Sequence, residues 1–413
     1  MKYRYIPNEP VFIIQPPRGP LAAYVQPFCA WAFDQGYERH SVRRRVALAA
    51  DFSQWLQRKD VSVTEVSSEH PAEYLRHLWR QRPIHGGDSP SLKQFMEFLR
   101  HQGIIAVDQP NPEPTTPVEQ CLREFETYLQ DQRGLAVTTV SQYTLYVRLF
   151  LRKCFGDDPI VLTDLRADDV TGFIQQESSP THFVRPKAIA ISLRSFFRFA
   201  HYRGAITADL AASVPKVASW SMSGIPRAIS EDQTRKLLSS IERGHGKGLR
   251  NYAILLLLAR LGLRSGEIAS LEIEDIDWIS GSLKVRGKGR EALYPLPQDV
   301  GEAIVAYLRH GRPPSTSRRL FLRCMAPFRG FRGSPAIGGI VHYAIKRAGV
   351  EAPTRGSHQF RHGLASQMLH HGSSLKEIGE LLGHRSIEVT KIYAKVDIDA
   401  LRKLALSWPG GVQ

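Results

Sequence analysis

The sequence predicts a mainly α-helical protein: two tandem helical modules followed by a C-terminal domain that contains a small β-hairpin. Apolar residues recur at helical spacing over most of the chain. Two proline-containing stretches, 107–117 and 214–227, interrupt this pattern and cannot continue a helix. One strand-like stretch occurs, at 283–297. We therefore expect domains at 1–106, 117–214 and 225–413.

The first module is expected to contain helices at 23–33, 41–56 and 91–102. In the second of these, Val42, Val46, Ala49 and Phe52 follow the i, i+3, i+4 spacing of a buried helix face. Ser41 stands where an N-cap residue is expected.

The second module repeats this plan, with helices predicted at 118–132, 138–153, 164–176 and 188–202. SLKQFMEFLRHQGII at 91–105 aligns without gaps with SLRSFFRFAHYRGAI at 192–206, and shares Ser, Leu, two Phe, Gly and Ile. This similarity indicates an internal duplication. The alternative is that two amphipathic helices with phenylalanine on the core side resemble each other by chance.

The C-terminal domain is expected to begin with a helix near Ser230, where S-E-D-Q fits a capping box. The apolar stretch 251–261 predicts a central helix. A hairpin at about 282–295 and helices at 300–309 and 337–348 follow.

The charge distribution indicates a polyanionic partner. The formal net charge is +15 and the pI is about 9.7. From Ile225 onward there are 29 Lys and Arg against 17 Asp and Glu, whereas residues 111–224 balance at 12 against 12. The alternative is an ordinary solvated basic surface, but the excess lies in the half that carries the motifs described next.

Other compartments and site classes are disfavoured. The four cysteines occur singly, without the C-x-x-C spacing of a zinc site, which fits a reducing cytoplasm. No run reaches the roughly 18 apolar residues of a membrane span, and the start of the chain lacks the apolar core of a signal peptide.

The stretch 357–396 carries the strongest functional pattern. His358 and Arg361 are three residues apart, so both project from one side of a helix. A second short helix ends at Gly383 and His384, and Tyr393 follows nine residues later. Because no tyrosine lies between Tyr343 and Tyr393, a phenol that reacts at this end of the chain must be that of Tyr393.

This order of motifs resembles the second signature box of the tyrosine recombinase (phage integrase) family. The stretch 255–278 resembles the first box, with Arg264 in a G-L-R-x-x-E context and Glu267 three residues on. The hairpin resembles the one that presents the family's lysine from a G-K-G turn, here Lys288. Five separated elements in the family's order make the resemblance specific, and it implies the family's catalytic domain preceded by a core-binding helical domain. The first module then stands where the family has an arm-binding or extra core-binding domain.

The resemblance also implies a role for each residue. Arg264 and Arg361 would bind the scissile phosphate, and His384 would donate to a nonbridging oxygen. His358 would bind the phosphate and assist proton transfer from the phenol. Lys288 would protonate the leaving 5′-oxygen, although Lys284, Arg286 and Arg290 share the hairpin. Glu267 would support the cluster, and Tyr393 would be the nucleophile.

Further basic residues are candidates for DNA phosphate contacts. They are Arg286, Arg290, Arg318, Arg319, Arg329 and Arg332. No acidic cluster accompanies Tyr393, so we expect a site without metal or other cofactor.

The resulting hypothesis is a site-specific recombinase that cleaves and rejoins double-stranded DNA through a 3′-phosphotyrosine, in the integration or transposition of a mobile element. The expected partners are duplex DNA and either three further copies in a homotetramer on paired sites or co-acting recombinases. Two alternatives remain open: an enzyme like the type IB topoisomerases, and a DNA-binding accessory protein with weak catalysis.

Overall fold

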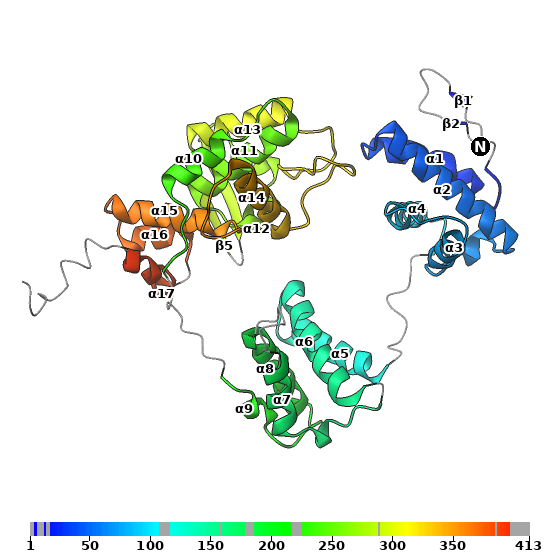
Figure 1. The fold of residues 1–413 in the computed structure, drawn as a ribbon, viewed down its shortest axis with the longest axis horizontal. Coiled ribbons are helices and arrows are strands. Elements are labelled where there is room, and N and C mark those ends of the chain that lie inside the picture. Colours follow the sequence, from blue (N-terminus) through cyan, green and yellow to red (C-terminus); the bar gives the residue numbers. More distant parts are fainter. Residues whose placement is uncertain are drawn as a thin grey trace, which may run out of the picture. The chain divides into compact units, whose positions relative to one another are not determined.

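The computed structural model describes residues 17–106, 116–156, 158–177, 186–216, 225–287, 290–384 and 386–396, and the backbone of the short strand pair β1 (Arg4–Tyr5) and β2 (Phe12–Ile13). This part of the chain is mainly helical with a small antiparallel sheet in the C-terminal domain, as predicted (Figure 1). No helix within these ranges combines the length and apolarity needed to cross a membrane. Residues 107–221 form one compact unit, and 1–106 together with 222–413 form the other.

The first module contains four α-helices: α1 (Ala22–Asp34), α2 (Arg39–Arg58), α3 (His70–Trp79) and α4 (Asp88–His101). The predicted N-cap at Ser41 is wrong, because α2 begins two residues earlier, after Glu38 in an extended conformation. The Ser41 hydroxyl instead accepts a hydrogen bond from Arg45 of the same helix. Phe28 packs against Phe95 and Phe98, with ring centroids 4.8 and 5.6 Å apart.

The middle module has a similar succession of helices: α5 (Pro117–Thr127), α6 (Val137–Phe155), α7 (Ala167–Glu177), α8 (Pro186–Tyr202) and the short α9 (Leu210–Ser213). A π-helical turn at Tyr128–Gln132 extends α5. Its core again centres on one phenylalanine that contacts two others: Phe125 lies 5.4 Å from both Phe196 and Phe199.

The residues that match between the modules in sequence are buried in both modules. Phe95 and Phe98 of α4 and Phe196 and Phe199 of α8 are all buried. Upstream, the matched pairs Val42 with Val140 and Phe52 with Phe150 are buried as well. A duplication and two unrelated amphipathic helices would both bury these residues, so the duplication stays a prediction.

The C-terminal domain is built around α11 (Gly246–Leu261), in which every residue from Ala253 to Leu258 is buried. A helix apolar on all sides must be covered on all sides. Three of the helices that pack against α11 are α10 (Glu231–Ser239), α13 (Gln298–His310) and α14 (Ser334–Ala348). The capping box at Ser230 is confirmed, with the backbone N–H of Gln233 donating to the Ser230 hydroxyl at 3.1 Å.

The predicted hairpin is also confirmed. β4 (Ser282–Gly287) pairs antiparallel with β5 (Arg290–Pro295), and β3 (Ile276–Asp277) adds a third strand beside β4. The register pairs Gly287 with Arg290, and the two residues between them in the sequence lie outside the described ranges.

Four short elements end the described chain: α15 (His358–His370), α16 (Leu375–Leu382), α17 (Ile387–Thr390) and the 3-10 helix η5 (Lys391–Val396). Three of them, α15, α16 and η5, share a small apolar cluster made of Ala365, Ile378, Leu382 and Tyr393. Tyr393 is therefore fixed by the packing of the helices that carry His358 and His384.

Candidate active site

Arg264 lies at the N-terminus of α12 (Ser265–Ser270) and is held by Glu267. One carboxylate oxygen of Glu267 accepts from the backbone N–H of Arg264 at 2.8 Å, and the other accepts from its guanidinium at 2.9 Å. Glu267 is buried, whereas the Arg264 side chain is 38% exposed. The carboxylate thus orients the guanidinium, and a guanidinium has further N–H groups with which to bind a ligand.

Arg361 is buried and joins two segments of the site. Its guanidinium donates to the carbonyl oxygen of Gly262 at 2.8 Å and also to that of Leu382. Gly262 precedes Arg264 by two residues, and Leu382 precedes His384 by two. Burial, with a smaller effect of nearby Arg264, lowers the pKa of Arg361 to about 10, so it remains charged at neutral pH.

His358 is the first residue of α15, and its neighbour Ser357 connects this helix to α12. The hydroxyl oxygens of Ser357 and Ser265 are 2.5 Å apart. Burial, followed by Arg361 and Arg264, lowers the pKa of His358, so the neutral imidazole is favoured. The two guanidinium groups and His358 therefore form one electrostatic cluster.

His384 follows the left-handed Gly383 that ends α16. Its Nδ1 lies 2.8 Å from the hydroxyl of Thr390, and its backbone N–H donates to the carbonyl of Gly379 at 2.8 Å. A Cβ on Gly379 would lie 3.0 Å from the Thr390 hydroxyl oxygen, so a glycine permits this close approach.

Tyr393 is buried between two histidines. Its hydroxyl lies 3.0 Å from Nδ1 of His362, and its ring is nearly parallel to that of His384, with centroids 6.4 Å apart. Burial raises the pKa of Tyr393, whereas the positive charges of Arg361 and Arg264 act in the opposite direction. Both guanidinium groups therefore lie close enough to act on the phenol.

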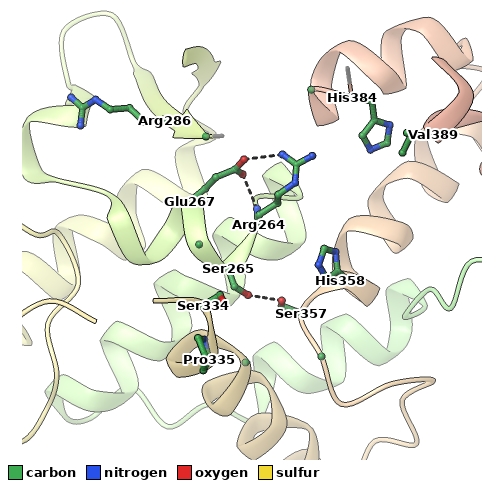
Figure 2. Close-up of a pocket in the computed structure, with 15 residues that line it drawn as sticks. Arg264, Ser265, Glu267, Arg286, Ser334, Pro335, Ser357, His358, His384 and Val389 are labelled. Carbon is green, nitrogen blue, oxygen red and sulfur yellow. Dashed lines mark hydrogen bonds and ion pairs between the residues drawn. The ribbon is translucent and has the colours of Figure 1, made fainter. Parts of the chain in front are cut away.

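These elements surround a pocket of about 890 Å³ (Figure 2). Arg264, His358 and His384 project into it from three different elements, as Figure 2 shows. Arg361 and Tyr393 are buried and do not line it, and the Tyr393 ring packs against that of the lining residue His384. The pocket thus joins three of the predicted catalytic residues directly, with two more packed against them.

Comparison with known proteins identifies the family. The model of the phage integrase family matches residues 227–399, and that of the phage integrase N-terminal SAM-like domain matches residues 122–204. The putative integrase/recombinase y4rA of Sinorhizobium fredii is 50% identical over 411 residues, which cover 99% of this chain and 100% of that protein. The chain belongs to the phage integrase family. It is thus an enzyme of the tyrosine-type site-specific recombinase class.

Two further proteins agree with this membership. Tyrosine recombinase XerD of Listeria monocytogenes is 31% identical over 289 residues, covering 67% of this chain and 93% of XerD. The crystal structure of XerH site-specific recombinase bound to palindromic difH substrate aligns with a TM-score of 0.56 and 19% identity, over 73% of this chain and 99% of that one. The structural match shows a shared recombinase fold.

The predicted DNA-contact residues of this recombinase differ in their surroundings. Arg286 forms ion pairs with the carboxylates of Asp275 and Glu291, at 2.8 and 3.4 Å. Arg318 pairs with Glu274, and Arg319 lies 3.5 Å from a carboxylate oxygen of Glu272.

The remaining basic candidates are less constrained or not described. Arg329 and Arg332 are exposed. Arg290 has its backbone in β5, but its side chain is outside the described atoms, and Lys288 lies outside the described residues altogether. Within the described ranges, no group of three or more His, Cys, Asp or Glu is arranged to hold a metal ion.

Several residues at the site of this recombinase were not found from the sequence. They are Ser265, Ser357, His362 and Thr390. The serines and the threonine carry no distinguishing spacing. His362 did have a signal, because it follows His358 by four residues and so shares its helix face.

Proposed function

We propose that the chain cleaves and rejoins double-stranded DNA at specific sites through a 3′-phosphotyrosine formed by Tyr393. The observation that carries this is the phenol of Tyr393, buried between two histidines and under the charges of Arg264 and Arg361, next to a pocket lined by Arg264, His358 and His384. Oη of Tyr393 would bond to the phosphorus while the bond from phosphorus to the 5′-oxygen breaks. The reverse attack by a DNA 5′-hydroxyl then reseals the strand without an external energy source.

The side chains have complementary tasks in this proposal. Arg264 and His384 bind the nonbridging oxygens from the pocket, and His358 contacts the same phosphate. Arg361 uses two N–H groups on the Gly262 and Leu382 carbonyls and has three left, which suffices to bind the phosphate as well. Lys288, which lies between β4 and β5 in the sequence, protonates the leaving oxygen.

The basic residues away from the pocket would bind the DNA backbone. Exposed ion pairs contribute little free energy, so phosphates can replace the carboxylates that now pair with Arg318 and Arg319. The Asp275 carboxylate that pairs with Arg286 is buried, so Arg286 would keep this pair and bind a phosphate with its remaining N–H groups. Arg329 and Arg332 form no ion pair within the described part of the chain, and Arg290 is the first residue of β5. Exchange between two duplexes requires four cuts, and one nucleophile per chain then calls for four copies on paired sites.

We assign the first module to DNA binding as an additional core-binding-like domain, because its buried aromatic pattern matches that of the middle module. The relative that aligns over 99% of this chain bears the name integrase/recombinase, whereas XerD covers 67% of it. This favours integration or transposition of a mobile element over chromosome resolution, with the reaction in the cytoplasm.

A covalent trapping experiment tests the proposal. The Tyr393→Phe protein selects its binding site from a random duplex library, and the selected duplex is then nicked beside each candidate phosphate. The unchanged protein is expected to form a covalent adduct at the 3′ side of one cut, with or without EDTA, and Tyr393→Phe is expected to bind without forming it. An adduct from Tyr393→Phe, or strict dependence on Mg²⁺, would contradict the mechanism.

A further inference from the structure

The histidine that contacts the nucleophile is His362. Its Nδ1 lies 3.0 Å from the hydroxyl oxygen of Tyr393, with the ring centroids 5.7 Å apart. His362 is the phenol's one hydrogen-bond partner in the ranges that the structure covers. His358, which the family resemblance relates to proton transfer, instead lines the pocket.

We propose that His362 is a further catalytic residue, whose Nδ1 accepts the phenolic proton of Tyr393 as the phenolic oxygen bonds to the DNA phosphorus. This inference rests on the proposed function. It assigns different roles to two histidines one helical turn apart: His358 contacts the phosphate, and His362 accepts the proton of the nucleophile.

The step balances without a further reactant. The O–H bond of Tyr393 breaks and its proton moves to Nδ1 of His362, which becomes an imidazolium. The phenolic oxygen forms its bond to phosphorus, and the bond from phosphorus to the 5′-oxygen breaks. The 5′-oxygen takes its proton from Lys288, the proposed acid. On resealing, His362 returns its proton to the departing phenolate. Acceptance at Nδ1 requires the tautomer that carries hydrogen on Nε2.

The surroundings of His362 suit an acceptor that is neutral before the reaction. Burial, then His358 and Arg361 on the same helix, lowers the pKa of His362. His362 faces Tyr393 of η5, and the ring of His384 stacks on Tyr393. The helix α11, which packs against α15, is largely aliphatic. The negative charge of a bound phosphate would offset the two guanidinium groups and strengthen His362 as a base when DNA arrives.

The rate of adduct formation on the selected nicked duplex, measured over a range of pH, tests the role. His362→Asn keeps a hydrogen-bonding atom near the phenol but cannot accept a proton. We expect it to slow adduct formation by about 100-fold at neutral pH. The difference from the unchanged protein should narrow as pH rises, because hydroxide then removes the phenolic proton. His370→Asn, on the exposed last turn of the same helix, is the matched control and should leave the rate unchanged.

A second variant and a spectroscopic measurement separate the possible outcomes. His358→Asn should slow the reaction by a factor that does not change with pH. In the DNA-free protein, ¹⁵N-histidine NMR should give His362 the Nε2–H tautomer, with a shift in Tyr393→Phe. An unchanged or faster rate in His362→Asn, or a constant deficit at every pH, would overturn the inference and leave the proposed function intact. A wild-type protein that forms no adduct would overturn both.

Discussion

The guanidinium of Arg361 donates to the carbonyl oxygen of Gly262 at 2.8 Å and so connects α15 to a segment 99 residues earlier in the chain. A second bond reaches the carbonyl of Leu382. Because Gly262 leads into Arg264 and Leu382 leads into His384, one buried cation fixes the backbone beneath two residues that line the pocket. Arg361 therefore has a structural role in addition to any contact with phosphate.

Replacing Arg361 with lysine should separate these roles. Lysine keeps the charge but cannot reach both carbonyls from one nitrogen, so at least one buried carbonyl loses its partner. We expect the free energy of unfolding to fall by about 2 kcal/mol, as measured by urea denaturation. The exposed Arg355→Lys is the control and should change it by less than about 0.5 kcal/mol. Equal stability of the two variants would mean that the carbonyl contacts contribute little.

Gly262 is a second position at which the site depends on the backbone. It ends α11 with φ of +58°, and a Cβ there would lie 3.0 Å from Leu364 and 3.1 Å from Leu382. Gly349 ends α14 with the same φ, but a Cβ there would meet nothing within 4 Å. Gly349→Ala should cost about 1 kcal/mol from the left-handed conformation alone.

Gly262→Ala should cost about 1–2 kcal/mol more than Gly349→Ala because of crowding against the two leucines. Thermal or urea unfolding of the two alanine variants measures the difference. If both lose the same stability, the leucines move aside freely and the segment before Arg264 is less tightly packed than its contacts indicate.

We expect the free energy of unfolding to fall in mild acid because of two histidines in α15. The pKa values of His358 and His362 are lowered in the folded chain, mainly by burial, whereas an unfolded histidine titrates near about 6.5. As pH falls below about 6.5, the unfolded chain binds protons that the folded chain does not, so the free energy of unfolding falls. The double variant His358→Asn/His362→Asn should show a smaller fall between about pH 7.5 and 5.5 in urea denaturation. If the free energy of unfolding of the double variant falls as much as that of the unchanged protein, groups other than these two histidines cause the loss of stability.

Patterns within single elements were predictable from the sequence. The spacing of Val42 and Phe52 placed a helix, and the three-residue spacing of His358 and Arg361 placed two functional groups on one helix face. Ser41 shows where local reasoning fails: α2 starts earlier, because the following apolar face packs whether or not its first turn is capped.

Contacts between elements could not be predicted in the same way. The approach of His362 to Tyr393 spans a sequence separation of 31 and depends on the turns at left-handed Gly372 and Gly383. The bonds of Arg361 to two carbonyl groups carry no signal in the sequence, because every residue has a carbonyl. Residue types indicated the chemistry of the site, but its second layer of contacts required the fold.

Lys288 is the predicted acid for the leaving oxygen, and its neighbour Lys284 provides a matched control. Lys284 lies on β4, where its ammonium forms an ion pair with Glu291 at 2.8 Å, whereas Lys288 follows β4 in the sequence and lies outside the described residues. Lys288→Ala should slow cleavage of the nicked duplex by about 100-fold or more. A 5′-phosphorothiolate should restore much of that rate, because a thiolate leaves without needing a proton. Lys284→Ala should cleave at close to the normal rate, and rescue of Lys284→Ala instead of Lys288→Ala would make Lys284 the acid.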